Sequence, residues 1–185
     1  AKHGVMSQKF KTVFHTSTHV NAPIHLIQGG KGVGQIDLDR FWGSGLVLSV
    51  PKDKWELVTA QDLEDLNPTI EPGDIVLINT GWHHKYADSQ EYFGHSPGLC
   101  KSAAQWLIDK QVKLVGVDTP QVDHPLATSL APHRNGPTMK RLAPEYKEAT
   151  GNEALDDFPE WNAAHKHLLA ADIPTIENVG GELDA

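Results

Sequence analysis

Three histidines and a carboxamide fall within one eleven-residue stretch of the chain, at His15, His19, Asn21 and His25. Neutral imidazole is the commonest protein ligand for zinc and similar divalent metals, and it also transfers protons near neutral pH. All four positions are odd-numbered, and the residues between the last three are mostly apolar, so a strand would gather the polar side chains on one face. The stretch therefore predicts either a metal site or a polar strand face whose histidines are satisfied by hydrogen bonds.

One geometric requirement separates these two interpretations. A straight strand rises about 3.3 Å per residue, which would hold His15 and His19 about 13 Å apart, too far to share one ion. A helix would bring them together, but the Thr, Val and Pro residues of this segment disfavour a helix. If the two imidazoles bind one metal, the backbone must bend near Ser17.

Length and composition limit the classes of protein to consider. The 185 residues suit one domain, which we take as 1–185, and 39% hydrophobic with 22% charged residues is typical of a folded globular protein. A net charge of −8 without a basic cluster argues against nucleic acid as a partner. We also expect no membrane partner, because no apolar stretch is long enough to span a bilayer. The sequence shows no secretory leader, and we predict a cytoplasmic protein.

The elements that must position the histidines can be read from hydrophobic patterning. Five segments rich in Val, Ile or Thr are expected to be strands: 13–27, 46–50, 74–80, 114–118 and 174–178. Thr59 as a cap with Asp62 in the first turn predicts a helix at 60–66. Helical spacing of apolar residues predicts two more, around 99–107 and at 161–171. The polar, Pro-rich segment 131–159 reads as a long loop outside the core. Strands and helices alternate, which predicts a mixed α/β domain.

The histidine spacing resembles the His-x-Gly-Thr-His-x-Asp-x-Pro-x-His signature of the metal-dependent cyclase hydrolases, a family that includes bacterial kynurenine formamidase and isatin hydrolase. Further similar segments follow in order at 73–82, 94–99, 116–123, 165–169 and 173–178, so the resemblance covers nearly the whole chain. It implies a mixed α/β fold of the swivelling β/β/α type and a homodimer or homotetramer. It also implies hydrolysis of a small amide, cyclic amide or ester with a Zn or Mn ion as cofactor.

The resemblance implies roles for individual residues. His15 and His19 match ligands of the first metal, and Asn21 stands where the family has a metal-binding aspartate. His25 matches a histidine that acts as general acid and base. Two later residues match the outer ligands of a second metal: His165 and Glu177.

Two of these assignments have support from the residues themselves. On a helix, His165 and His167 differ by about 200° in direction, and His165 shares its face with Trp161 and Leu168. Glu177 ends an apolar strand-like run, where a carboxylate without a partner would be costly and a nearby cation would remove the cost. The alternative for Glu177 is an ordinary carboxylate at a strand end.

Four aromatic residues are candidates to line a substrate pocket, with plain core packing as the alternative for each: Phe41, Trp42, Trp82 and Trp161. Five other histidines have no spacing that singles them out and are expected to be surface or structural, with His124 a further candidate near the metal: His83, His84, His95, His124 and His133.

The chain departs from the family pattern in three ways. Ser17 replaces a glycine, which would add strain of about 1 kcal/mol or more if that backbone needs a positive φ. Asn21 replaces an aspartate, and because an amide oxygen is a neutral donor we predict weaker metal binding and a preference for one ion. The signature also begins at His15, whereas the family usually carries several dozen residues before it, so we expect an N-terminal segment to be lacking.

The resulting hypothesis is a metal-dependent amidohydrolase that cleaves the C–N bond of an arylformamide or an isatin-like ring. A divalent metal would activate water, and His25 would transfer a proton. The alternatives are a lactone or ester hydrolase of the same family, or a catalytically impaired binding protein in which Asn21 weakens the site. A serine hydrolase is disfavoured, because the chain has no Gly-x-Ser-x-Gly motif.

Overall fold

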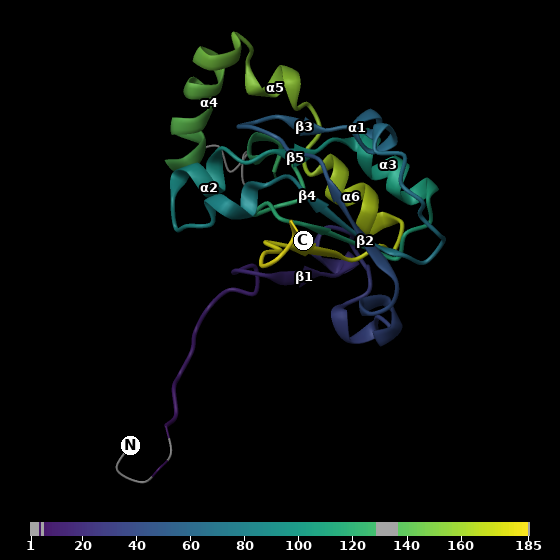
Figure 1. Cartoon of the computed structure of the whole chain (residues 1–185). Helices are drawn as coiled ribbons and strands as arrows, with labels where there is room; N and C mark the ends of the chain where they lie inside the picture. The colour runs from purple at the N-terminus through teal and green to yellow at the C-terminus, as the bar shows by residue number, and fades with distance from the viewer. Residues whose placement is uncertain (1–3, 5, 129–136, 185) are drawn as a thin grey trace.

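The computed structural model describes residues 4, 6–128 and 137–184. Its centre is a five-stranded sheet in the order β1-β7-β6-β4-β2, in which β1 is antiparallel to β7 and the other neighbours are parallel (Figure 1). The strands are β1 His19–Asn21, β2 Gly45–Ser49, β4 Ile75–Asn79, β6 Leu114–Val117 and β7 Thr175–Glu177. A two-stranded parallel sheet pairs β3 Leu57–Val58 with β5 Gly98–Leu99.

The structure has six helices in its described part. They are α1 Ala60–Asp65, α2 Gln90–Gly94, α3 Lys101–Asp109, α4 Pro137–Thr150, α5 Ala154–Asp157 and α6 Ala163–Ala170. Short 3₁₀ turns lie at Pro23–His25, Val33–Gln35, Leu38–Phe41, Trp82–Lys85 and Pro125–Ala127. Helices α3 and α6 pack on each other and lie against the sheet (Figure 1). Their apolar side chains form the main core with those of β2, β4 and β6.

The central strands form because their apolar residues become buried. Strand β6 is buried along its whole length, and β4 is apolar from Ile75 to Ile78. Continuous Val, Ile and Leu runs are typical of strands covered on both sides. The other face of the sheet is less covered at its edges, where Val20 and Val47 are 38% and 41% exposed.

The mixed α/β fold is confirmed, and so are the strands expected near 46–50, 74–80, 114–118 and 174–178 and the three expected helices. No helix in the described part of the chain is long and apolar enough to cross a membrane.

Two expectations were wrong. The expected strand over 13–27 is a strand only at His19–Asn21, because the chain turns at Ser17 and Pro23 opens a 3₁₀ turn. The other is the expected loop over 131–159, of which 131–136 lie outside the described residues.

Helices α4 and α5 occupy the described part of that segment. Leu142 and Tyr146 lie four residues apart on α4 and are buried against Trp55, Leu126 and Phe158 in a second apolar cluster. The polar remainder of α4 and its internal proline concealed this narrow apolar stripe from the sequence pattern.

Candidate metal centre

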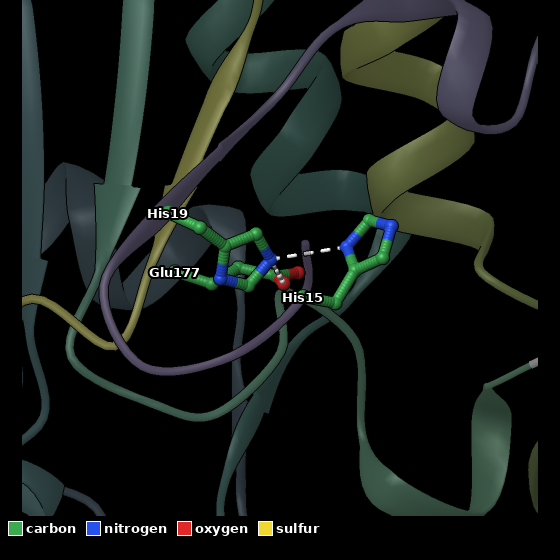
Figure 2. A group of neighbouring side chains, drawn as sticks. All are labelled: His15, His19 and Glu177. Atoms are coloured by element: carbon green, nitrogen blue, oxygen red, sulfur yellow. Dashed lines mark hydrogen bonds and ion pairs between the residues drawn. The ribbon is translucent and has the colours of Figure 1, made fainter. Parts of the chain in front are cut away.

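The chain turns back on itself immediately before β1. Ser17 has φ of +59°, in the left-handed region, and this confirms the bend that a shared metal requires. The carbonyl oxygen of Ser17 accepts hydrogen bonds from His19 Nδ1 at 2.8 Å and from Asn178 Nδ2 at 3.1 Å. As a result His15 lies beside His19, with 3.1 Å between His15 Nδ1 and His19 Nε2 (Figure 2).

The bend predicts the effect of restoring a glycine at this position. A non-glycine residue in the left-handed region costs about 1–2 kcal/mol, partly offset by the extra freedom that glycine gives the unfolded chain. Ser17→Gly should therefore raise the free energy of unfolding by about 0.5–1 kcal/mol in urea titrations. Ser17→Ala is the matched control, since it also lacks the hydroxyl but keeps the strained Cβ, and it should give no gain. A lower free energy of unfolding in the Ser17→Gly protein would contradict the interpretation that the backbone of Ser17 is strained.

His19 is fixed in one tautomer by its surroundings. A carbonyl oxygen can only accept, so Nδ1 carries the proton and Nε2 is left with its lone pair. That lone pair lies 3.1 Å from Glu177 Oε2, which is also an acceptor. The Glu177 carboxylate raises the pKa of His19 above its usual value, because a proton on Nε2 turns the two facing acceptors into a hydrogen bond. The position between these two atoms therefore favours a positive charge, from a proton or from a metal ion.

Glu177 lies at the centre of the cluster because of strand register. It is the direct partner of His19 across the β1–β7 ladder. Its Oε1 accepts a hydrogen bond from the Val122 N–H at 3.1 Å and lies 3.6 Å from His165 Nδ1. Burial acts to raise the pKa of Glu177, but the hydrogen bond from His19 and the nearby imidazoles outweigh it, and the pKa is lowered.

His165 approaches the cluster from helix α6. Its Nε2 lies 2.8 Å from Thr175 Oγ1, which leaves Nδ1 toward Glu177. Burial lowers the pKa of His165 to about 4, so the ring is neutral at pH 7. The buried carboxylate of Asp123 fixes the start of α6 by accepting the backbone N–H groups of Ala164 at 2.8 Å and of His165 at 3.3 Å.

His25 completes the cluster from the 3₁₀ turn after β1. Its ring centroid lies 4.2 Å from that of His15 and 5.4 Å from that of His165. Burial and the neighbouring His15 lower the pKa of His25 below its usual value. His25 shares with the other histidines a cavity of about 310 Å³, lined by His15, His19, His25, Phe93, Pro120, Gln121, Asp123, Thr128, Asn162, His165 and Glu177.

Asn21 lies on the same face of β1 as His19, two residues further along. It is 1% exposed, and its side chain interacts with the Glu177 carboxylate, whose pKa it lowers. Its Oδ1 makes no hydrogen bond within the described residues, and a buried polar atom without a partner costs about 1–3 kcal/mol. Its Oδ1 is a hard oxygen donor that a cation would satisfy, and so this side chain fits a metal centre better than a hydrogen-bonded strand face.

The donor set also fits a single ion. Ligand atoms of His15, His19 and Glu177 all lie within 4.8 Å of one another (Figure 2). Two donors that each lie about 2.0–2.1 Å from a tetrahedral zinc ion are about 3.4 Å apart, close to the 3.1 Å spacings here. The structure thus groups Glu177 with His15 and His19, whereas the sequence had placed it with His165. Glu177 lies between His19 and His165. Its Oε2 is 3.1 Å from His19 Nε2, and its Oε1 is 3.6 Å from His165 Nδ1.

The four aromatic candidates are not among the residues that line this cavity. Trp82 is 2% exposed and donates its Nε1–H to the Tyr92 carbonyl, so it is a core residue. Trp161 lies on another surface hollow beside Lys101 and His167. Phe41 and Trp42 lie before β2, where Trp42 is 72% exposed.

Sequence reasoning missed other residues of the cavity, notably Phe93 and Gln121. Neither has a spacing that marks it, because Phe93 reaches the cavity from the short helix α2 and Gln121 from a loop. His124 is a core residue, fully buried and stacked on Phe158 at 4.1 Å between ring centroids. His133 lies outside the described residues.

The chain is similar in sequence to known proteins. Residues 2–124 match the Cyclase family, described as "Putative cyclase". A kynurenine formamidase of Bacillus cytotoxicus is 31% identical over 119 residues, which are 64% of this chain and 54% of that protein. One of Bacillus cereus is 30% identical over 125 residues, which are 68% of this chain and 56% of that protein. The chain thus spans about half the length of these curated relatives.

Solved structures show the same fold. An isatin hydrolase bound to the product analogue thioisatinate matches with a TM-score of 0.69 at 19% identity, covering 95% of this chain and 63% of that chain. Isatin hydrolase A from Ralstonia solanacearum matches with a TM-score of 0.67 at 23% identity, covering 92% and 61%. Because the family match extends over more than half of the sequence, the chain belongs to the cyclase family.

Proposed function

We propose that this chain is a metal-dependent hydrolase that cleaves the C–N bond of a small amide or cyclic amide, with Zn or Mn as its cofactor. The observation that carries the proposal is the convergence of His15, His19 and Glu177 on one point beside His25, in one cavity. When His19 is neutral, its Nε2 and Glu177 Oε2 are two acceptors at 3.1 Å, so the pair favours a positive charge between them, from a metal ion or from a proton.

The residues divide into those that hold the ion and those that act on the substrate. His15, His19 and Glu177 would hold the metal, with Asn21 Oδ1 and His165 Nδ1 as further donors. When bound, a divalent metal polarises a carbonyl and lowers the pKa of water from 15.7 toward about 7. His25 is neutral at pH 7 because its pKa is lowered, so it can accept a proton from water and return it to the leaving nitrogen.

The cavity supports a small substrate. Its volume of about 310 Å³ lies at the lower end of the usual range for ligand pockets. Phe93 on its wall offers a face for an aromatic ring, and Gln121 has a buried Nε2 with no hydrogen-bond partner in the described part of the chain. The names of the relatives favour an N-formyl aromatic amine or an isatin-like ring as the substrate class.

The direct test is a hydrolysis screen with added Mn or Zn over N-formyl anilides, isatin-like rings and lactones, combined with elemental analysis of gently purified protein. We expect near-stoichiometric metal and turnover of the amides. Turnover of lactones alone would move the function to ester hydrolysis. A site that stays empty on soaking, with no turnover, would favour a binding protein.

Asn21 gives a prediction about metal affinity. Asn21→Asp should add a carboxylate beside His19 and Glu177, and a charged oxygen binds a divalent ion more tightly than an amide oxygen does. We expect metal to bind at least about tenfold more tightly, measured by titration against a competing chelator, which corresponds to about 1.4 kcal/mol. Asn162→Asp changes another buried asparagine, which lines the cavity but is not among the proposed ligands, and it is the matched control. Equal affinity in wild type and Asn21→Asp would show that this side chain is not a ligand.

We further propose that residues 1–185 form one domain and that the chain assembles as a homodimer or homotetramer. One main core shared by α3, α6 and the sheet supports a single domain.

Exposed apolar side chains before β1, such as Phe10 and Phe14 at 83% and 95%, support self-association. This segment runs away from the body of the protein in Figure 1. Sedimentation equilibrium tests the assembly, and a monomer at micromolar concentration would refute it.

A further inference from the structure

A second cluster of histidines and a carboxylate lies outside the cavity described above. His83 and His84 belong to the 3₁₀ turn η4, Trp82–Lys85, which follows β4, and Asp184 lies in the C-terminal segment. One ligand atom of each lies within 4.8 Å of those of the other two. The Nε2 atoms of His84 and His83 are 2.8 Å and 3.4 Å from Asp184 Oδ2.

The orientation of His83 is set by a buried carboxylate. His83 Nδ1 lies 3.2 Å from Oδ2 of Asp118, which is 0% exposed. The other oxygen of Asp118 accepts from the backbone N–H and the hydroxyl of Thr80 at 3.1 and 2.7 Å. Since an ionised carboxylate only accepts, Nδ1 of His83 carries the proton and Nε2 keeps its lone pair.

This lone pair has no ordinary partner. The His83 side chain is 7% exposed, and its Nε2 is buried and makes no hydrogen bond within the described residues. It faces Asp184 Oδ2, which is itself an acceptor, so the contact is unfavourable unless a positive charge lies between the two atoms. A histidine that donates one nitrogen to a carboxylate and presents the other to a cation is the usual arrangement of a metal-binding imidazole.

Asp184 is also held in place. Its Oδ1 accepts a hydrogen bond from Asn79 Nδ2 at 3.0 Å, which leaves Oδ2 toward the histidines. The ring centroids of His83 and His84 are 4.0 Å apart, so both imidazoles approach from one side. The side chains of His84 and Asp184 are 63% and 52% exposed, which leaves a path for an ion and room for a further ligand from solvent.

We propose that His83 Nε2, His84 Nε2 and Asp184 Oδ2 bind one zinc-type transition-metal ion, and that Asp118 orients His83. Two imidazoles and one carboxylate suit zinc, copper or nickel better than calcium or magnesium, which prefer oxygen donors. The ion would join the C-terminal segment to η4. Its role is therefore a structural clamp, independent of the hydrolytic centre.

The test isolates this site by working in a His19→Ala background, in which the first cluster has lost a donor. Zinc titration against a chromophoric chelator should still show one site per chain. Adding His84→Ala or Asp184→Asn should weaken that site at least about 100-fold, more than the loss of an outer-shell partner usually does. His95→Ala removes a histidine paired with Glu145, outside both clusters, and should leave zinc binding unchanged.

Two further measurements decide the location and the role. A zinc-soaked crystal should show an anomalous peak among the three ligand atoms, and zinc should raise Tm in the His19→Ala protein but not after His84→Ala. Hydrolysis by the His84→Ala and Asp184→Asn proteins in the wild-type background should be unchanged, which separates this site from the proposed function. Equal zinc binding with and without His84 and Asp184, as expected if a proton supplies the charge, would overturn the proposal.

Discussion

Replacing His25 with glutamine should lower kcat/KM for amide hydrolysis by about 10²–10⁴-fold, the usual contribution of a positioned acid–base group. His25 lies beside the cluster of His15, His19 and Glu177 without belonging to it. Metal content should therefore stay unchanged in the variant, as elemental analysis can check. An ester with a good leaving group needs less protonation than an amide does, and its hydrolysis should fall much less.

The pH profile gives an independent readout of the same residue. Burial and the neighbouring His15 lower the pKa of His25 below 6.5, so the free base predominates at pH 7. Activity that needs this base should be full above that pKa and should fall as the pH drops through it, which places the acid limb below pH 6.5. This acid limb of the pH–rate profile should be absent in the His25→Gln protein. An equal loss for amide and ester, with the limb retained, would remove His25 from the proton-transfer role.

Replacing Glu177 with glutamine should have the largest effect on metal binding. Loss of an outer-shell partner usually costs about 10–100-fold in affinity, and a direct ligand should cost more, so we expect a loss above about 100-fold. Activity at limiting metal should fall in parallel, and excess metal should restore part of it. The measurement is a chelator-competition titration followed by a metal-dependence curve of the rate.

The glutamine variant is chosen so that the fold survives. Its amide oxygen can still accept the N–H of Val122, the bond that Glu177 Oε1 makes at 3.1 Å. Glu160→Gln, which changes an exposed carboxylate paired with Lys101, is the matched control and should behave as wild type. Unchanged metal affinity in a folded Glu177→Gln protein would exclude Glu177 as a ligand and with it the metal centre as assigned.

Local sequence patterns were sufficient to predict many of the strands and helices of the fold. The apolar runs of β4 and β6 and the helical spacing of α6 were sufficient to predict these elements, because burial on a regular element leaves a periodic trace in the sequence. The bend at Ser17 followed from a distance limit: two imidazoles four residues apart on a straight strand cannot share an ion. Helix α4 was missed because Leu142 and Tyr146 are its only buried apolar side chains among the described ones, too few to show a period.

The sequence by itself determined the chemistry available to this protein: a bent, histidine-rich segment with His25 close behind it, and a carboxylate at the end of an apolar strand. Only the tertiary structure decided which groups meet. The β1–β7 register placed Glu177 opposite His19, and loop packing brought Asp184 to His83 and His84. The physical reason is that strand register and loop packing bring together residues that are far apart in the chain. Such contacts depend on the complete tertiary structure and produce no periodic pattern in the local sequence.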